Sequence, residues 1–313
     1  MEGLASGRRA TAARAESTPT LTLDVTVLLP AFNEERAIEH VLNEIVEALR
    51  DEPCQFEILV VDDASIDRTA AYAQRFADRC TRCEVRVVRR AENGGAGAAR
   101  KTGIRAARGG VVVMLDADGS YPAESVRDVL RHFPEYDQVN GARTSEQGTL
   151  PWLRAPAKWF IRKLACYLTG RDIPDLNTGL KAFKREAMLD WLWVVPDGFS
   201  CVTTMTLAFL TNGYAVKYVP TPYRRRIGQS KFHPLKDTLA YINTVVRITS
   251  YFRPLRVFMP AAAAVAALGI AKSFWSWHAT GTMQESDVVI LTASFMTAMF
   301  GLLAEIVVAH HRR

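Results

Sequence analysis

Apolar runs of strand length alternate with helix-like segments along the first part of the chain. The runs at residues 25–30, 56–62 and 85–89 are separated by stretches whose apolar residues recur at helical spacing. This alternation predicts an α/β fold with a mostly parallel sheet, in which right-handed crossovers bring the carboxyl ends of the strands to one edge. We therefore expect Pro30 and Asp62, which end the first two runs, to face a common cleft.

A fourth apolar run ends abruptly in two carboxylates. Residues 111–115 predict a strand buried on both faces, and Asp116-Ala117-Asp118 follows it directly. Open α/β sheets bind ligands outside the carboxyl ends of their strands, and paired carboxylates there suit a hard divalent cation that binds substrate phosphates. A simple turn is the alternative, because Asp-Ala-Asp-Gly is also favourable turn chemistry.

A glycine-rich segment at residues 92–103 precedes this strand. Gly94, Gly95 and Gly97 suggest a phosphate-binding loop, but neither the Gly-x-Gly-x-x-Gly pattern nor the Walker spacing occurs here. Close backbone packing at the start of a helix is therefore favoured over direct contact with phosphate.

Two later segments carry clustered cations. Residues 153–169 place arginine and lysine at helical spacing among bulky apolar residues, which fits a helix on a membrane surface or an ordinary helix with a solvated basic face. Residues 223–231 hold four cations with glycine and serine between them. This composition predicts a loop that closes over a polyanion, and a disordered charged loop is the alternative.

The C-terminal part of the chain has the composition of a membrane hairpin. Residues 257–271 are an apolar run of fifteen, and residues 288–309 form a run of twenty-two with one charged residue, Glu305. A helix needs about 20 apolar residues to cross the hydrocarbon. The link at 278–287 contains no Lys or Arg, whereas arginines flank both outer ends, so the positive-inside rule places the N-terminal domain in the cytoplasm. Two buried helices of a soluble domain are the alternative.

These patterns divide the chain into four parts. We expect a disordered tail at 1–24, an α/β domain at 25–232, juxtamembrane amphipathic helices at 233–254, and a final part at 255–313. That part holds two transmembrane helices, at about 257–277 and 288–309. The tail lacks an apolar core of signal-peptide length, and a transit peptide is its alternative reading.

The amino-acid composition narrows the possible partners and functions of the protein only slightly. The 313 residues include 39 Lys and Arg against 33 Asp and Glu, and this modest basic excess does not choose between nucleic acid, an anionic membrane and a phosphorylated substrate. The five cysteines are odd in number and lack framework spacing, which fits a reducing compartment. Cys80 and Cys83 have no second pair at zinc-ribbon distance, so two ordinary thiols are favoured over a zinc site.

Several short motifs in order over residues 25–231 resemble those of the polyprenyl-phosphate glycosyltransferases of the dolichol-phosphate mannose synthase type. This group belongs to the inverting glycosyltransferase family two and has a GT-A fold, and its bacterial members also carry two trailing transmembrane helices. The matching pieces are Pro30-Ala-Phe-Asn-Glu34, Val61-Asp-Asp-Ala-Ser-Ile-Asp-Arg-Thr69, Asn93-Gly-Gly95, Ala99 to Gly103, Asp116-Ala-Asp118, Asp175 to Phe183, and Arg226-Ile-Gly-Gln-Ser-Lys231. The resemblance implies that residues 25–232 are a GT-A, Rossmann-like nucleotide-sugar domain.

The resemblance also implies where a sugar nucleotide and its metal bind. The residues that would hold the nucleotide-sugar are Pro30, Phe32, Glu34, Asp62, Asp116, Ala117 and Asp118. Asp116 and Asp118 would bind Mg²⁺ or Mn²⁺ on the diphosphate. Relatives often have Gln at the position of Ser120, so whether Ser120 is a third metal ligand stays open.

On the acceptor side, the resemblance implies a cluster of cations. Arg226 and Lys231 would meet the donor diphosphate or the acceptor phosphate, and Arg143 and Arg154 would bind the acceptor phosphate. Asp175 is assigned a positioning role or a weak base role in catalysis.

The implied activity is metal-dependent transfer of a sugar from a UDP- or GDP-linked donor to a polyprenyl phosphate, for assembly of cell-envelope glycans or glycoconjugates. The expected location is the inner membrane, as a multi-pass protein with a cytoplasmic catalytic domain. No nucleic acid partner is expected, and a homo-oligomer is left open.

Three rival functions are weighed against this activity. The alternatives are a transferase acting on a hydroxyl of a glycolipid or glycan, a nucleotidyltransferase, and a catalytically silent membrane scaffold. A nucleotidyltransferase would normally carry a Gly-rich loop where this chain has Ala31-Phe-Asn-Glu34. The Gln-x-x-Arg-Trp motif of processive polysaccharide synthases is absent from the sequence, which disfavours a polymerase of that type.

Overall fold

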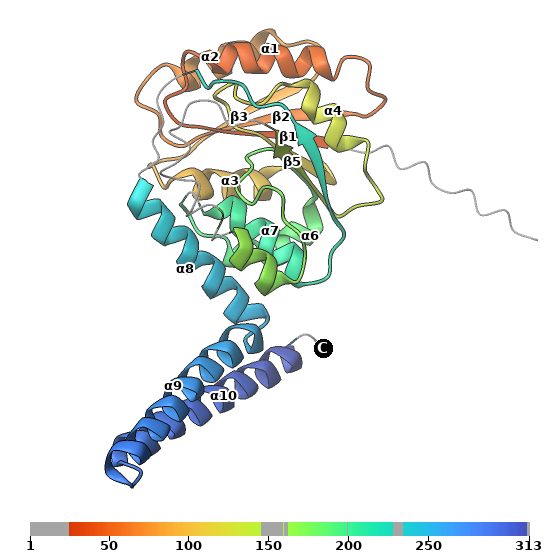
Figure 1. Ribbon diagram of the computed structural model, residues 1–313. Coiled ribbons are helices and arrows are strands. Elements are labelled where there is room, and N and C mark those ends of the chain that lie inside the picture. The colour runs from red at the N-terminus through yellow and green to blue at the C-terminus, as the bar shows by residue number, and fades with distance from the viewer. Residues whose placement is uncertain (1–24, 145–158, 160–161, 199, 228–233, 312–313) are drawn as a thin grey trace, which may run out of the picture.

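The protein is an α/β domain from which a two-helix hairpin projects (Figure 1). The computed structural model describes residues 25–144, 159, 162–198, 200–227 and 234–311, so the predicted tail at 1–24 lies outside the described residues. Within the described residues the sheet has seven strands, in the order β3-β2-β1-β4-β6-β5-β7. The predicted α/β fold with a mostly parallel sheet is confirmed.

The elements follow one another closely along the chain. The strands are β1 (Val25–Ala31), β2 (Phe56–Asp62), β3 (Glu84–Arg89), β4 (Val111–Met114), β5 (Gln138–Arg143), β6 (Lys181–Lys184) and β7 (Val216–Thr221). The helices are α1 (Ile38–Ala48), α2 (Thr69–Arg79), α3 (Ala96–Ala106), α4 (Glu124–Leu130), α6 (Arg185–Trp191), the 3-10 helix η1 (Leu192–Val194), α7 (Cys201–Thr211), α8 (Pro234–Phe252), α9 (Leu255–Thr280) and α10 (Glu285–His311).

The centre of the sheet brings three strand ends to one edge. β1 lies between β2 and β4 and is parallel to both, with Ala31 opposite Asp62 and Leu28 opposite Met114. Because the three strands run in the same direction, the loops that leave them start side by side. The predicted common edge of these strand ends is therefore confirmed, and the cleft expected at that edge stays a prediction.

β6 is the strand that breaks the parallel pattern. It is antiparallel to both β4 and β5, and its first residue, Lys181, pairs with Met114 at the end of β4. Since the two strands run in opposite directions, Gly179 and Leu180 enter the sheet where β4 leaves it. The segment from Asp175 is thereby brought to the same edge as the carboxylates.

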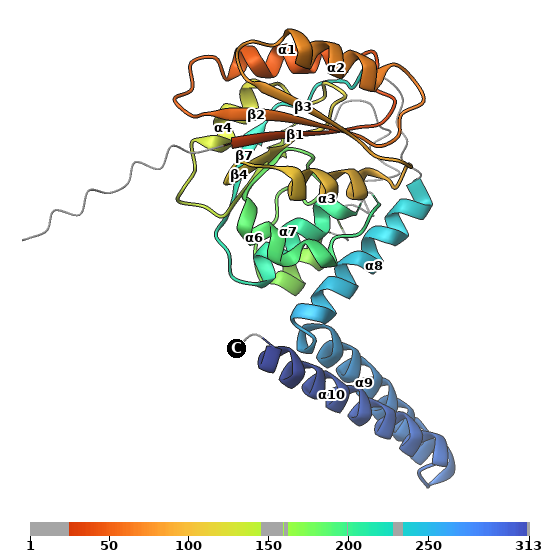
Figure 2. The same ribbon diagram turned by 180° about the vertical axis from the view of Figure 1, so that it is seen from behind.

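Helices cover both faces of the sheet (Figure 1 and Figure 2). α1, α2 and α4 pack on one face around Ile38, Ile45 and Phe76, whereas α3, α6 and α7 pack on the other around Ile104 and Met205. A sheet buried on both faces needs apolar residues at nearly every central position, which explains the continuous runs in β1, β2 and β4.

α8 connects the domain to the hairpin. Its inward residues Val245, Ile248 and Phe252 are buried against α7. We expected more than one juxtamembrane helix at 233–254, but residues 234–252 form a single helix in the described part. α8 ends at Phe252, just before Pro254, and Pro254 is the N-cap residue of α9.

α9 and α10 lie side by side as an antiparallel hairpin (Figure 1 and Figure 2). Both are long and apolar enough to cross a membrane, and large apolar side chains such as Phe295 and Leu303 are exposed along them. The two helices contain the predicted spans 257–277 and 288–309. A pair of buried helices inside a globular domain does not fit this exposure.

Charged groups inside the hairpin are partnered across the two helices. Near its open end, the Glu305 carboxylate accepts a hydrogen bond from the backbone N–H of Leu255 at 3.4 Å. Near its closed end, Lys272 Nζ lies 2.5 Å from Asp287 Oδ1. Each helix therefore supplies the partner for a polar group of the other.

Candidate active site

Asp116 is held on two sides in the loop that leaves β4. Its Oδ1 accepts a hydrogen bond at 2.6 Å from Nη2 of the buried Arg100, which comes from α3. On the other side the carboxylate packs so closely on Gly179 that a Cβ there would overlap it. About a third of the Asp116 side chain remains exposed, at 35%. Its direction is therefore fixed while part of it can still meet a ligand.

Asp118 is more deeply buried than Asp116. Its side chain is 9% exposed, and its Oδ1 accepts a hydrogen bond at 3.0 Å from the backbone N–H of Ser120. Burial raises the pKa of Asp118, and the neighbouring Asp116 carboxylate raises it further. Two carboxylates held this close repel each other, and a divalent cation between them would remove that repulsion.

The donor set of this loop fits a hard divalent cation. Mg²⁺ is commonly held by one or two carboxylates together with substrate phosphates and water. No group of three or more His, Cys, Asp and Glu side chains that could hold a metal occurs in the described part of the chain. Ser120 is fully buried beneath Asp118, and its role as a third ligand stays a prediction.

The cation-rich segment that begins at Tyr223, the basic loop, lies directly along the carboxylate loop, which carries Asp116 and Asp118 after β4. The backbone N–H of Arg224 donates to Ser120 O at 2.8 Å, and that of Ile227 donates to Asp118 O at 2.9 Å. These bonds place Nη1 of Arg226 at 3.7 Å from Asp118 Oδ2, with 39% of the arginine side chain exposed. Lys231 lies outside the described residues, so its role and the closure of this loop stay predictions.

The loops after β1 and β2 are joined by reciprocal hydrogen bonds. The backbone N–H of Asn33 donates to Ser65 Oγ at 2.9 Å, and the backbone N–H of Ile66 donates to Asn33 Oδ1 at 3.0 Å. Asn33 has a positive φ of 54°, and α1 begins only at Ile38. Asn33 therefore does not cap this helix, because its side chain bonds the neighbouring loop instead.

The predicted donor residues differ in exposure. Phe32 and Glu34 are partly exposed at the strand edge, whereas Pro30 is buried within β1. Asp62 is fully buried, and its carboxylate accepts from the backbone N–H of Ser65 and lies 3.3 Å from Nε of Arg89. In this arrangement Asp62 shapes the loop after β2, and its contact with a nucleotide stays a prediction.

The glycine-rich segment is bound by protein groups. The Asp63 carboxylate accepts hydrogen bonds from the backbone N–H groups of Gly94 at 3.1 Å and Gly95 at 2.8 Å. The N–H of Gly97 donates to Asp197 O at 2.7 Å. The backbone donors that a phosphate would need are thus occupied, and the packing interpretation of this segment is confirmed.

Gly97→Ala is expected to destabilise the domain by about 1–3 kcal/mol, because a Cβ at this position would overlap the carbonyl oxygen of Pro196. Gly198→Ala is the matched control, since nothing lies within 4 Å of a Cβ there. Thermal unfolding in detergent should show a clear drop for the first variant and little change for the second. Equal melting temperatures for the two variants would contradict the packing role of Gly97.

Arg143 and Asp175 form a bidentate ion pair. Nε of Arg143 lies 2.7 Å from Asp175 Oδ2, and its Nη2 lies 2.9 Å from Oδ1. Burial alone would raise the pKa of Asp175, but the hydrogen bonds and charge of Arg143 outweigh it and hold that pKa below its usual value. An ionised carboxylate with both oxygens bonded is a poor base, so the positioning role fits Asp175 better.

A chain of contacts links this ion pair to the carboxylate loop. The Arg143 guanidinium lies 5.4 Å from the ring centre of Tyr223, and that ring packs edge-on to Tyr121 at 5.2 Å. The Tyr121 hydroxyl accepts the N–H of Gly179 at 2.8 Å, and Gly179 in turn contacts Asp116. The predicted acceptor side and the predicted metal side therefore belong to one site. Arg154 lies outside the described residues.

Two buried cations beneath the site were not anticipated. Arg100 bonds Asp116 and also donates to Cys201 Sγ at 3.1 Å. Lys181 is fully buried, donates to Asn140 Oδ1 at 3.0 Å and to Thr206 Oγ1 at 2.6 Å, and burial lowers its pKa to about 7. The sequence feature that could have indicated their burial is the neighbouring residues, because each cation follows small or apolar residues in the chain.

A mostly parallel sheet with a carboxylate pair at its strand ends and an arginine beside that pair is the arrangement expected of a glycosyltransferase of the GT-A class. The chain belongs to glycosyl transferase family 2, whose family model matches residues 26–192. A second model, the GtrB C-terminal hairpin, matches residues 253–309. The protein is therefore a glycosyltransferase with a membrane-associated hairpin of two apolar helices.

Named relatives cover most of the chain. It is 31% identical over 227 residues to a dolichyl-phosphate hexose transferase of Haloferax volcanii, covering 72% of this chain and 93% of the relative. It is 27% identical over 304 residues to an undecaprenyl-phosphate 4-deoxy-4-formamido-L-arabinose transferase of Sodalis glossinidius, covering 92% and 90%. The relatives bear names of polyprenyl-phosphate sugar transferases.

Solved structures support the fold. Glucosyl-3-phosphoglycerate synthase from Mycobacterium tuberculosis, in complex with Mn²⁺, UDP-glucose and phosphoglyceric acid, superposes with a TM-score of 0.55 at 21% identity, covering 72% of this chain and 80% of that chain. At this identity the likeness establishes the GT-A fold alone.

Proposed function

We propose that the protein transfers a sugar from a nucleotide-sugar to a polyprenyl phosphate at the membrane surface. Support comes from the matched relatives, whose names specify dolichyl or undecaprenyl phosphate, and from the C-terminal helices, which match the GtrB C-terminal hairpin model. Support also comes from the site, in which Arg226 lies beside Asp118 of the carboxylate pair, because an arginine and a metal-binding carboxylate together suit a diphosphate.

The state of Asp175 is the observation that favours a phosphate acceptor over a hydroxyl. A hydroxyl acceptor needs a general base with a pKa near the working pH. Asp175 has a lowered pKa and is bonded through both oxygens to Arg143, so it does not meet that requirement. A phosphate monoester is already ionised at neutral pH, so it can attack once it is correctly positioned.

The charged residues of the site would act on the leaving group. Asp116 and Asp118 would hold Mg²⁺ or Mn²⁺, and the bound ion would neutralise charge that develops on the departing diphosphate. Arg226, beside Asp118, would bind the same diphosphate and hold it in the direction required for displacement. Lys231, Arg154 and Ser120 are proposed in the supporting roles that the family resemblance implies.

The orientation that we propose follows from the positions of the arginines. Arg247, Arg253 and Arg256 precede the hairpin, and Arg312 and Arg313 follow it, so both outer ends would face the cytoplasm of a bacterial inner membrane. The catalytic domain, continuous with α8, would lie on that side, where nucleotide-sugars are made.

The proposal is tested by supplying each acceptor in turn. Membranes containing the protein would be incubated with labelled UDP- and GDP-sugars, Mg²⁺ or Mn²⁺, and either undecaprenyl phosphate or a glycolipid with free hydroxyls. We expect a labelled lipid that mild acid releases as free sugar, because a polyprenyl-phosphate sugar is an acid-labile phosphodiester. An acid-stable product formed on the glycolipid would favour the hydroxyl acceptor instead.

Arg226→Gln is expected to raise the Kd for the nucleotide-sugar at least about tenfold, because it removes a charged donor to the diphosphate. The neighbouring Arg225 is exposed, and Arg225→Gln provides a control with the same change of charge. Donor affinity would be measured by calorimetry in detergent with Mn²⁺ present. If both variants weaken binding equally, the effect is one of net charge and Arg226 has no specific contact.

A further inference from the structure

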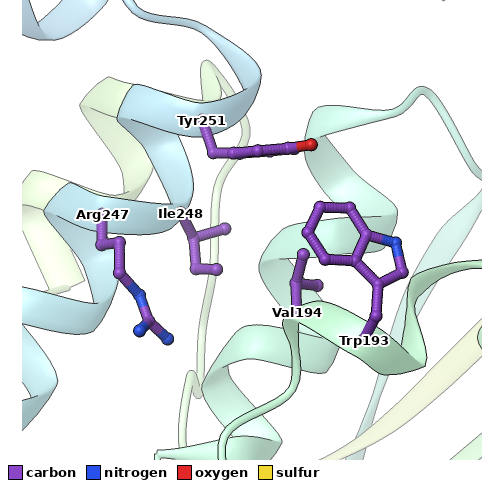
Figure 3. Close-up of a pocket in the computed structure, with 5 residues that line it drawn as sticks. All are labelled: Trp193, Val194, Arg247, Ile248 and Tyr251. Carbon is purple, nitrogen blue, oxygen red and sulfur yellow. The ribbon is translucent and has the colours of Figure 1, made fainter.

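A shallow hollow of about 230 Å³ lies between η1 and the C-terminal part of α8. Figure 3 shows its lining, in which Val194 and Ile248 lie between Trp193 on one side and Arg247 on the other, with the Tyr251 ring extending toward Trp193. We name these five residues the interfacial patch. None of them belongs to the candidate active site.

The interfacial patch exposes two large aromatic rings. Trp193 is 61% exposed and Tyr251 is 49% exposed, and their ring centres are 5.1 Å apart in an edge-on arrangement. The neighbouring Phe252 points inward, is 2% exposed and packs edge-on against Trp191 at 5.2 Å. Because Phe252 fixes the end of α8 against the domain, the outward direction of Tyr251 is a built feature of the fold.

The interfacial patch lies next to the point where the chain enters the hairpin. Tyr251 precedes the first residue of α9, Leu255, by only four positions, and Arg247 stands one turn before Tyr251 on the same side of α8. Arg256, in the first turn of α9, donates to the backbone oxygens of Tyr167 and Leu168 and so ties the hairpin to the domain. With the hairpin embedded in a bilayer, the interfacial patch would therefore lie at the level of the membrane surface.

Its chemistry matches a layer of lipid headgroups. Tryptophan and tyrosine concentrate where hydrocarbon meets water, because each ring has an apolar body and a polar group. An arginine near an anionic leaflet is attracted by the negative surface potential of the lipids. A second copy of the chain fits less well, because a two-fold contact would bring two copies of Arg247 to one patch, and no carboxylate of the described residues lines that patch.

We propose that the interfacial patch docks the catalytic domain onto the phospholipid headgroup layer, with Trp193 and Tyr251 in the interface and Arg247 against lipid phosphates. This inference rests on the hairpin being embedded in the membrane, and it does not depend on which acceptor the enzyme uses. Docking at this point sets how the domain lies on the bilayer, in addition to the tether that the hairpin provides.

Quenching by brominated lipids tests this docking without any assay of activity. The full chain would be reconstituted in phosphatidylcholine vesicles brominated near the headgroup or deep in the acyl chain. The emission of Trp193 is the difference between the wild type and Trp193→Phe. We expect shallow bromine to quench most of this emission and deep bromine to leave most of it.

Trp191 provides the matched control for this measurement. It is partly buried, and its indole N–H donates to the Tyr214 hydroxyl at 3.3 Å. The difference between the wild type and Trp191→Phe should show little quenching by either lipid. Emission of Trp193 that no bromine quenches would overturn the proposal, even if the enzyme is fully active.

Lipid charge tests the part assigned to Arg247. Adding phosphatidylglycerol, with Trp193 as the probe, should increase quenching by shallow bromine, and Arg247→Gln should abolish that increase. Arg82 is exposed on the turn between α2 and β3, and Arg82→Gln should retain the increase. Loss of the increase in both variants, or in neither, would refute the headgroup contact. So would a dimer in vesicles that Trp193→Ser dissociates, because a second copy would then occupy the interfacial patch.

Discussion

Asp118→Asn is expected to lower the rate of sugar transfer by at least roughly 10²-fold, the usual loss when a charge-stabilising group is removed from a site. The substitution keeps an oxygen that can accept the Ser120 N–H, so the loop should retain its shape. It removes one of the two neighbouring carboxylate charges that we propose would hold the metal. The loss should therefore appear in kcat and in the affinity for Mn²⁺, with the melting temperature unchanged.

The control for this variant is another aspartate of the same domain. Asp128 lies on the surface of α4 with its side chain 48% exposed, and Asp128→Asn makes the same chemical change away from the site. Transfer would be measured with saturating donor over a range of Mn²⁺ concentrations. If Asp118→Asn turns over at a rate close to that of Asp128→Asn, the metal position has been assigned to the wrong residues.

Arg143→Gln and Asp175→Asn are each expected to lower the melting temperature by roughly 6–20 °C, since breaking a buried pair costs about 3–5 kcal/mol. The two side chains are only 15% and 13% exposed, so neither charge can return to water when its partner is removed. The double variant Arg143→Met with Asp175→Leu should be less destabilised than the sum of the single changes, because it removes both charges of the pair together.

The pH dependence of this effect follows from the lowered pKa of Asp175. A carboxyl whose pKa falls on folding stabilises the native state fully above its unfolded pKa of about 4, and this contribution is lost as the pH falls through the folded pKa. The difference in melting temperature between the wild type and Asp175→Asn should therefore be constant near neutrality and shrink below about pH 4.

An exposed pair provides the comparison. Arg131 and Asp128 are 64% and 48% exposed and lie 3.3 Å apart, and removal of either should change stability by no more than about 1 kcal/mol. A loss of similar size at both pairs would mean that Arg143 and Asp175 are solvated in the working enzyme. In that case Asp175 would again be a candidate base.

Much of the fold could be predicted because a strand that is buried on both faces of the sheet is apolar at nearly every position of its sequence. The runs that became β1, β2 and β4 are continuous and apolar, and parallel strands leave a sheet at one edge, so Asp62 and Asp116 could be placed together before any coordinates. The same reasoning found the hairpin, since long apolar helices have few other settings. The packing role of Gly97 followed from the absence of a phosphate-loop spacing.

What could not be predicted depends on partners distant in sequence. Arg100 and Lys181 are charged residues, which an argument from hydrophobic periodicity assigns to the surface. Each is nevertheless buried, because another segment of the chain supplies its hydrogen-bond acceptor. Asparagine just before a helix is a favoured N-cap, but the Asn33 side chain accepts a hydrogen bond from Ile66 of the next loop instead. The pairing of Arg143 with Asp175, which changes the chemistry assigned to both, spans thirty-two positions and has no local signature.

The cross-partnered charges of the hairpin bear on how the protein reaches its place in the bilayer. If α9 entered the hydrocarbon alone, it would carry Lys272 without Asp287. If α10 entered alone, it would carry Glu305 without the backbone N–H of Leu255 at the start of α9. Each helix is thus a poor substrate for independent insertion. We therefore expect the two helices to enter the bilayer together, as one hairpin in which the contacts near both ends have already formed.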